Sequence, residues 1–271
     1  MDLQQGGTPI KIYTLMENTV KDENFCCEHG LSLYVETAKH RLLFDTGGSA
    51  AFAENAAKLG VDLSQVDICI ISHGHNDHGG GLAKFLELNS AAPIYISRYG
   101  FERHFAGTER EISISAALKA SGRFVFVDDY LRIDEELELC SCNDKKALHF
   151  ADSFGLNMLQ DNQFIPDDFR HEQYLTIYEN GRKVLLSGCS HKGILNLMEW
   201  LKPDICIGGF HFMKLATSGA DEKILQEAAR ELEALPAEYY TCHCTGAEQY
   251  AYLKERMTKL HYLAAGDVLE I

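Results

Sequence analysis

One stretch of the chain decides how the rest is interpreted: Ser72-His73-Gly74-His75-Asn76-Asp77-His78-Gly79-Gly80-Gly81. Three histidines and an aspartate fall within six residues, at the end of an apolar run that predicts a strand. His73 and His75 are two residues apart, so on an extended backbone their side chains point the same way. Asp77 and His78 follow where the glycines let the chain turn, so they can face a neighbouring position. Imidazole and carboxylate groups suit Zn²⁺, Fe and Mn²⁺, and the loop is therefore expected to supply ligands to two adjacent metal ions.

A polar turn with capping side chains is the alternative interpretation of this loop. Four potential ligands packed so closely would repel one another or stay half-satisfied without a cation, so the metal site is favoured. More ligands are then needed from further along the chain. They are offered by Cys189 and His191 after one predicted strand, His171 before another, His211 after a pair of glycines, and His243 at the end of a late strand.

Two other features near these positions are open to more than one interpretation. Asp45 ends a predicted strand in Leu43-Phe44-Asp45-Thr46-Gly47-Gly48. It is either a carboxylate that orients a ligand histidine from behind or an ordinary Asx turn. Cys242 and Cys244 flank His243 and would point to the opposite face of a regular strand, so both are predicted to be core thiols.

Composition excludes several classes of protein. The 271 residues are 46% hydrophobic and 24% charged, which argues against a disordered chain, a collagen or a coiled coil. The formal net charge of −15 argues against binding of nucleic acid or of an anionic membrane. Nine cysteines, an odd number, do not suggest a disulfide scaffold, and neither a signal peptide nor a transmembrane run of about 20 apolar residues is visible. A cytoplasmic protein with reduced thiols is expected.

The pattern along the chain mixes strands and helices with no linker, so we predict a single α/β domain over residues 1–271. Strands are predicted over residues 10–15, 31–36, 41–44, 66–72, 94–97, 124–127, 174–178, 184–187, 204–207, 239–242 and 268–271. Helices are predicted over residues 51–59, 82–88, 111–120, 193–201, 221–235 and 247–259. Residues 143–169 have no clear period and are expected to form a long irregular connection, a kind of loop that is often functional.

Taken in order, four motifs resemble those of the metallo-β-lactamase superfamily: Phe44-Asp45-Thr46-Gly47, His73-x-His75-x-Asp77-His78, Gly188-Cys189 and the late His243. The resemblance runs from Ile10 to the C-terminus and implies a four-layer αββα sandwich with a metal pair at one edge. Four further motifs are similar to the branch of 7,8-dihydropterin-6-methyl-4-(β-D-ribofuranosyl)aminobenzene-5′-phosphate synthase and related metal-dependent hydrolases. They are Glu28-His29-Gly30-Leu31-Ser32, Gly188-Cys189-Ser190-His191, Gly208-Gly209-Phe210-His211 and His243-Cys244-Thr245-Gly246.

The resemblance also implies a ligand set. His73 and His75 would bind the first metal ion, and Asp77, His78 and His243 the second. The third histidine of the first site is His191 by the motif of this branch, whereas the spacing usual in the superfamily points to His171; His191 is preferred because its motif is the more specific. Cys189 stands where the superfamily usually has a bridging aspartate, so whether it binds metal stays open.

The chemistry that this resemblance implies is hydrolysis by a metal-bound hydroxide. Two divalent cations, zinc first with iron or manganese as alternatives, would lower the pKa of a shared water. Asp77 would orient that hydroxide, and His211 would donate a hydrogen bond to the oxyanion or leaving group. His29, Lys192 and Thr245 are candidate substrate contacts.

Three functions follow for a small-molecule substrate. The first is hydrolysis of a small ester, lactone or phosphoester. The second is a synthase-type transfer that joins a pterin diphosphate to an aminobenzene riboside. The third is a metal-binding or redox-sensing module without turnover. The sequence leaves the substrate and the oligomeric state open.

Overall fold

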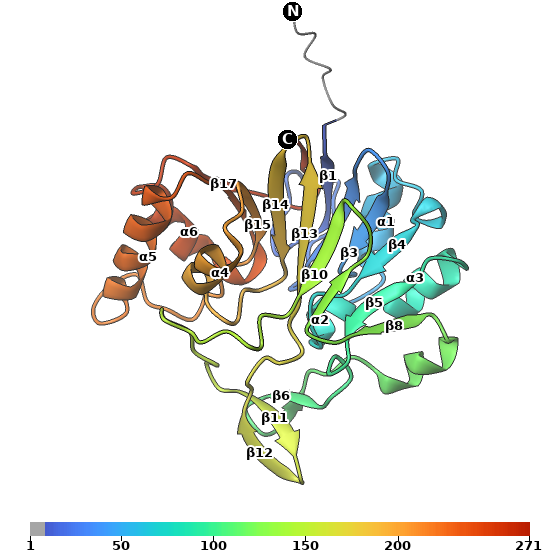
Figure 1. Cartoon of the computed structure of the whole chain (residues 1–271), viewed down its shortest axis with the longest axis horizontal. Helices are drawn as coiled ribbons and strands as arrows, with labels where there is room; N and C mark the ends of the chain where they lie inside the picture. The colour runs from blue at the N-terminus through green and yellow to red at the C-terminus, as the bar shows by residue number, and fades with distance from the viewer. Residues whose placement is uncertain (1–8) are drawn as a thin grey trace, which may run out of the picture.

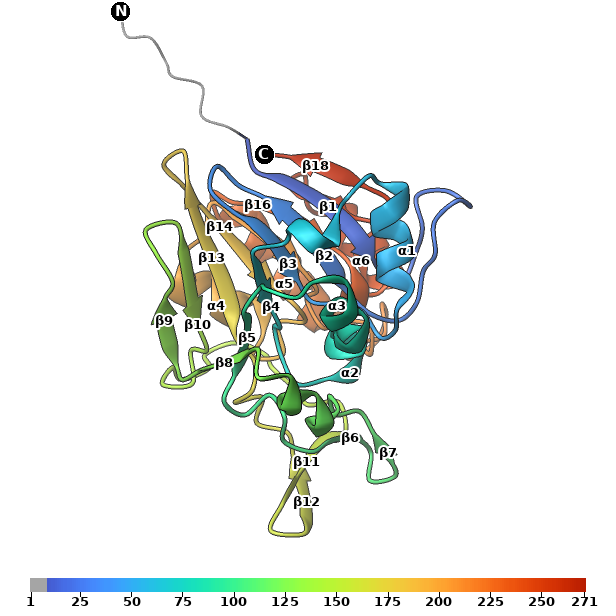
Figure 2. The same cartoon turned by 90° about the vertical axis from the view of Figure 1, so that its right-hand side faces the viewer.

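In the computed structural model, which describes residues 9–271, two seven-stranded β-sheets lie face to face and helices cover the outer face of each (Figure 1). The layers therefore run helix, sheet, sheet, helix, as the turned view also shows (Figure 2). This confirms the predicted αββα sandwich. Within residues 9–271, no helix is both long enough and apolar enough to cross a membrane.

The first sheet is built from the N-terminal half of the chain and the last strand. Its strands lie in the order β18 (Val268–Glu270), β1 (Lys11–Met16), β2 (Ser32–Glu36), β3 (Arg41–Phe44), β4 (Ile68–Ile70), β5 (Ile94–Ser97) and β8 (Phe124–Val127). The pairs from β18 to β3 are antiparallel and those from β3 to β8 are parallel. Its outer face packs against α1 (Ala51–Lys58) and α3 (Leu82–Leu88).

The second sheet is built from the C-terminal half. Its strands lie in the order β17 (Leu260–Tyr262), β16 (Glu238–Thr241), β15 (Ile205–Gly208), β14 (Arg182–Ser187), β13 (Tyr174–Glu179), β10 (Leu137–Cys140) and β9 (Tyr130–Arg132). The strands β14 to β17 run parallel to one another. Its outer face packs against α4 (Ile194–Leu201), α5 (Glu222–Ala234) and α6 (Ala247–Lys254).

A third, four-stranded sheet projects from one end of the sandwich, at the bottom of Figures 1 and 2. Its order is β12 (Gln163–Pro166), β11 (Leu156–Gln160), β6 (His104–Ala106) and β7 (Arg110–Glu111). Four short helical pieces complete the fold: α2 (Asn76–Gly79) and the 3₁₀ turns η1 (Leu63–Gln65), η2 (Ala116–Ser121) and η3 (His243–Thr245).

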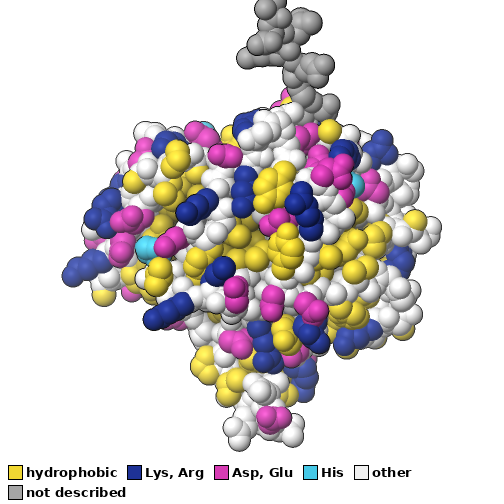
Figure 3. Space-filling view, in the orientation of Figure 1, with side chains coloured by type: hydrophobic (Ala, Val, Ile, Leu, Met, Phe, Trp, Pro, Cys, Tyr) yellow, Lys and Arg dark blue, Asp and Glu magenta, His cyan; other side chains and the backbone are white. Residues whose placement is uncertain are grey.

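Side-chain alternation along the strands explains the layering. Leu42 packs into the core between the two sheets, whereas its neighbour Leu43 packs against the helices of the first sheet. In the second sheet, Leu186 faces the same central core and Leu185 faces the outer helices. Successive residues of a strand point to opposite faces, so a strand buried on both sides is apolar throughout. On the face in Figure 3, basic and acidic side chains are interspersed rather than gathered by sign.

Two sequence predictions were wrong. The helix expected over residues 111–120 is replaced by β7, a bridge from Ser113 to His75 and the 3₁₀ turn η2. Backbone hydrogen bonds that Ile112 and Ile114 make to His104 and to the loop after β4 hold this segment extended, and they outweigh its helical pattern. The stretch 143–169 is also not wholly irregular, because β11 and β12 form a hairpin. Its turn, Asp161-Asn162, has positive φ at both residues, as tight hairpin turns require.

Candidate metal centre

The predicted ligands gather where strands of both large sheets end. His73, His75, Asp77 and His78 follow β4, Cys189 and His191 follow β14, His211 follows β15, and His243 follows β16. Parallel strands bring their carboxyl ends to one edge of a sheet, which is where α/β folds place their sites. Residues far apart in the sequence, such as His78 and His243, are therefore neighbours here.

One set of donors consists of three imidazoles. His73 Nε2 lies 3.4 Å from His191 Nε2, and the ring centroid of His75 lies 4.6 Å from that of His73 and 5.1 Å from that of His191. One nitrogen from each ring lies within 4.8 Å of the others, and all three residues are buried. Three imidazole nitrogens in this arrangement can hold one divalent metal ion.

A second set of donors adjoins the first. His78 Nε2 lies 3.2 Å from His243 Nε2, and one carboxylate oxygen of Asp77 lies 3.5 Å from His243 Nε2 and 3.9 Å from His78 Nε2. Cys189 Sγ lies 3.3 Å from His78 Nε2, and it is grouped with donors of both sets. The thiol therefore adjoins both donor sets, and whether it binds metal stays a prediction.

Buried polar side chains orient the second set from behind. Asp45 Oδ2 accepts a hydrogen bond from His78 Nδ1 at 2.7 Å, a position from which it can orient that ring. Asn18 Oδ1 lies 2.8 Å from His243 Nδ1, and Glu17 accepts the His243 backbone N–H. Hydrogen bonds to the far ring nitrogen fix an imidazole's tautomer and leave the near nitrogen for a metal ion.

The electrostatics of the cluster suit cation binding. Burial, reinforced by His78, holds the pKa of His73 well below its ordinary value, and burial with His211 does the same for His191. Burial alone would raise the pKa of Asp77, but His78 and His243 hold it well below its usual range. These groups therefore present neutral imidazoles and an ionised carboxylate, the forms that bind metal.

His78 and Cys189 behave differently without a metal ion. Burial alone would lower the pKa of His78, but Asp45 and Asp77 raise it to about 9. Burial and Cys244 raise the pKa of the Cys189 thiol well above its ordinary value. A cation at this position would take the place of the proton on each group.

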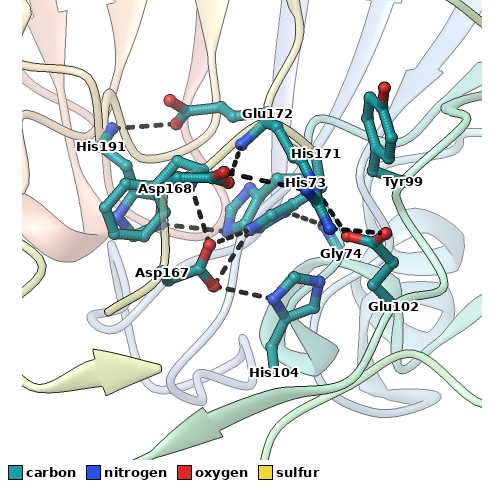
Figure 4. Close-up of polar contacts among 12 residues, drawn as sticks. His73, Gly74, Tyr99, Glu102, His104, Asp167, Asp168, His171, Glu172 and His191 are labelled. Atoms are coloured by element: carbon teal, nitrogen blue, oxygen red, sulfur yellow. Dashed lines mark hydrogen bonds and ion pairs between the residues drawn. The ribbon is translucent and has the colours of Figure 1, made fainter. Parts of the chain in front are cut away.

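His171 lies in a different environment from His191. Its Nδ1 accepts the Gly74 backbone N–H at 2.9 Å, and its Nε2 faces Asp167 at 3.3 Å (Figure 4). Asp167 also accepts a hydrogen bond from His104 Nδ1 at 2.7 Å. Burial would raise the pKa of Asp167, but His171 and His104 hold it well below its usual range. Both nitrogens of His171 are thus engaged within this neighbouring group.

A cavity of about 670 Å³ opens onto the donor sets. His75, Asp77, His191, His211 and His243 line it together with Cys189, and His29 stands at its edge with Nε2 3.3 Å from Asp77. Its walls also carry the cations Arg110 and Lys214 and the apolar side chains of Ile112, Phe154 and Met213. A small molecule with an apolar body and an anionic group would match this lining.

Two candidate substrate contacts lie elsewhere. The Lys192 ammonium donates to the backbone carbonyls of Ser141 and Glu172, and the residue lines a second cavity, which shares His191 with the first. The buried Thr245 hydroxyl lies 2.5 Å from that of Thr241 and accepts the Phe210 N–H, which supports the loop that carries His211. Neither is on the wall of the cavity beside the donor sets.

One cysteine prediction also needs correction. Cys242 packs in the central core as predicted, but Cys244 lines the cavity and is grouped with Cys189 and His243. The chain turns into η3 after β16, so the strand alternation assumed for Cys244 does not continue.

The two donor sets suit divalent metal ions. Within the described chain, both ring nitrogens of His211 are buried without a hydrogen-bond partner, and His211 is grouped with the donors Cys189 and His191. Buried polar atoms without partners are costly, and a bound cation or its water is a common explanation.

Sequence reasoning missed several residues of this region. Glu17 and Asn18, beside His243, directly follow the apolar strand β1, which was a usable signal. Glu172 accepts the His191 backbone N–H at 2.9 Å and adjoins His171 in the sequence. His104 and Asp167 carried no signal, because their strands are short and irregular in pattern.

Comparisons with known proteins identify the family and the fold. The family model of the metallo-beta-lactamase superfamily matches residues 27–242. The chain is 30% identical to the 7,8-dihydropterin-6-methyl-4-(beta-D-ribofuranosyl)-aminobenzene-5′-phosphate synthase of Methanocaldococcus jannaschii, over 96% of each chain. Among solved structures it is similar to Tm1679, described as a metal-dependent hydrolase of the beta-lactamase superfamily, with 27% identity, a TM-score of 0.81 and coverage of 97% and 99%. YhfI from Bacillus subtilis, described as a metallo-beta-lactamase fold protein, has a similar fold, with a TM-score of 0.60 and 14% identity over 97% and 100% of the two chains.

Proposed function

Because the chain belongs to the metallo-β-lactamase superfamily, we propose that it is a metal-dependent hydrolase of a small ester, lactone or phosphoester. The observation that carries the proposal is the pair of adjoining donor sets at the floor of one cavity. Neutral imidazoles, an ionised carboxylate and an open cavity are the arrangement that metal-dependent hydrolysis needs.

Two divalent ions, zinc first and iron or manganese as alternatives, are the proposed cofactors. His73, His75 and His191 would hold one ion, and Asp77, His78 and His243 the other. His191 is chosen over His171 because its nitrogen lies 3.4 Å from that of His73, whereas both His171 nitrogens are engaged elsewhere. Bound metal ions lower the pKa of a coordinated water and polarise the substrate oxygen.

The protein's own side chains would position the reactants. Asp77 is one-fifth exposed, faces the cavity and can orient the attacking water through its carboxylate. His211 faces the same space, with its ring centroid 4.1 Å from that of His191 and no partner on either nitrogen among the described residues. It would donate a hydrogen bond to the developing oxyanion or to the leaving group. His29 would help to hold Asp77.

The cavity walls would select the substrate. Arg110 and Lys214 would attract an anionic group, and Phe154 and Met213 would receive an apolar or aromatic portion. The overall charge of −15 disfavours an anionic ligand on average, so these two cations would provide the local attraction.

A synthase-type transfer is a second candidate. It is favoured by the 30% identity to the archaeal synthase over 96% of both chains and by the two cations in the cavity. The same ions would then activate a diphosphate leaving group. Release of inorganic diphosphate from a pterin diphosphate in the presence of an aminobenzene riboside phosphate would support transfer, and hydrolysis of nitrophenyl esters, lactones or phosphodiesters would support the first candidate.

Elemental analysis of protein purified without chelator tests the proposal directly. Near two metal ions per chain are expected, about one in His191→Ala and near two in His171→Ala. His261→Ala is the matched control, because His261 stacks on Tyr240 at the surface. Wild-type protein that binds no metal even after reconstitution would refute the proposal and leave a redox-sensing or binding module. Two metal ions in His191→Ala would refute the ligand assignment. Metal-loaded protein that turns over neither the pterin diphosphate nor the nitrophenyl esters, lactones and phosphodiesters would favour a non-catalytic metal-binding module.

A further inference from the structure

A buried carboxylate beside the metal centre contacts three imidazoles. Asp167 follows β12, and its side chain is 1% exposed. Its oxygens lie 2.7 Å from His104 Nδ1, 3.3 Å from His171 Nε2 and 3.7 Å from His75 Nε2. Figure 4 shows Asp167 joined to His104 and facing the cluster of rings. A carboxylate so deeply buried needs partners, and the described residues supply imidazoles from three separate segments.

The hydrogen bonds fix the tautomer of His171. Its Nδ1 accepts the Gly74 N–H, so in the neutral ring the proton sits on Nε2, where it points at Asp167. With one nitrogen accepting and the other donating, His171 has no lone pair left for a metal ion. This explains why the histidine at the usual superfamily spacing stands beside the candidate centre as support.

His75 presents its far nitrogen to the same carboxylate. His75 Nε2 is buried without a hydrogen-bond partner among the described residues, and Asp167 Oδ2 is the acidic oxygen that it faces. The ring of His75 also lines the cavity and belongs to the set with His73 and His191. A proton on Nε2 directed at Asp167 would leave Nδ1 as the nitrogen that faces the metal position.

We propose that Asp167 is the positioning residue for His75, a role that rests on the proposed metal-dependent function. Asp167 holds the proton on His75 Nε2 and directs Nδ1 to the first metal ion. It also ties the loop of residues 72–81, called the metal loop from here on, to the small four-stranded sheet of β12, β11, β6 and β7. The tie is direct, because His104 begins β6 and Asp167 follows β12. A bridge between His75 and Ser113 joins the same loop to the segment after β7.

Asp167→Asn removes the charge at constant shape and tests this role, with Asp168→Asn as the matched control. Asp168 is the next residue and is about half exposed; among residues 9–271 it accepts the local Arg170 N–H and makes a distant contact to the Arg170 guanidinium. Zinc affinity is measured by competition with a chromogenic chelator. We expect one zinc ion to bind about 10- to 100-fold more weakly in Asp167→Asn, and both to bind as in wild type in Asp168→Asn.

A second measurement uses wild-type protein, so it does not depend on whether Asp167→Asn folds. Nitrogen-15 NMR of the zinc-loaded protein is expected to show the proton of His75 on Nε2 and zinc on Nδ1, a signature that a merely structural role would not require. Zinc on His75 Nε2, or equal zinc affinity in both variants, would overturn the role of Asp167. So would three zinc ions per chain, because the group around Asp167 would then itself bind metal. Wild-type protein without any zinc would overturn the proposed function first, and this inference with it.

Discussion

Asp45→Asn probes how strongly the buried hydrogen bonds behind the candidate metal centre stabilise the fold. The Asp45 carboxylate is fully buried and accepts three hydrogen bonds of 2.7 Å, from the Ser72 N–H, the Ser72 hydroxyl and His78 Nδ1. Asp45 also has a φ of 61°, a left-handed conformation that asparagine tolerates about as well as aspartate. The substitution therefore changes the hydrogen bonding without adding backbone strain.

The loss in free energy of unfolding follows from the hydrogen bonds that Asp45→Asn changes. The one oxygen of the asparagine side chain can still accept the Ser72 N–H, but the amide nitrogen replaces the oxygen that serves the Ser72 hydroxyl and His78. All three charge-assisted hydrogen bonds, of about 1.5–3 kcal/mol each, are replaced by neutral ones of about 1 kcal/mol, so the free energy of unfolding should fall by about 1.5–6 kcal/mol. The amide would also donate to His78 Nδ1, drive the ring proton to Nε2 and weaken metal binding at the proposed second site.

Urea unfolding of the metal-free protein, followed by circular dichroism, measures this loss. Asp62→Asn is the control, because Asp62 is an exposed N-cap of η1 that accepts the Ser64 N–H, and asparagine caps equally well. Its free energy of unfolding should match that of wild type. An Asp45→Asn protein within about 1 kcal/mol of wild type, or one that retains full zinc occupancy, would refute the reasoning.

Three further predictions concern pH, packing and metal. Burial lowers the pKa of His171 to about 3, so below an ordinary histidine pKa of about 6.5 the unfolded chain binds more protons than the folded one. The free energy of unfolding of the metal-free protein should therefore fall, because of this group, by about 1.4 kcal/mol per pH unit as the pH falls from about 6.5 towards 3. A urea midpoint that stays constant between about pH 7 and 4 would contradict this. Gly188→Ala places a Cβ 2.2 Å from Ser72 Oγ and should lower the free energy of unfolding by about 1–3 kcal/mol in urea. Gly48→Ala is the control, because its Cβ would lie 3.5 Å from its nearest neighbour, an ordinary contact distance, and its free energy of unfolding should match that of wild type; equal losses in the two variants would argue against crowding at Gly188. Zinc at about a hundred times its Kd should add about 2.7 kcal/mol to the free energy of unfolding, and chelator should reverse the rise in Tm; an unchanged Tm in calorimetry would contradict metal binding to the folded state.

Local sequence signals predicted most of the sandwich but not the small sheet. Most strands of the two large sheets are apolar runs such as β3 and β14, which stand out because they are largely buried on both faces. The strands β9, β10 and β17 carry polar or exposed residues and were not predicted. The strands of the small sheet are two to five residues long, and β7 and β12 are largely exposed, so their patterns are weak. The helical spacing of residues 111–120 was misleading because tertiary pairing with the metal loop decided its conformation.

The sequence by itself determined which side chains form the core of the candidate metal centre. His73, His75, Asp77 and His78 lie within six residues, so covalent spacing alone brings their side chains together. Only the tertiary structure decided which distant groups join them. His191 meets His73 across 118 residues, and His171 meets Asp167 instead, because pairing between strands and the docking of the small sheet set these neighbours. Residues that are close in the sequence can be recognised as neighbours from their spacing alone. Residues that only tertiary packing brings together show no such pattern in the sequence.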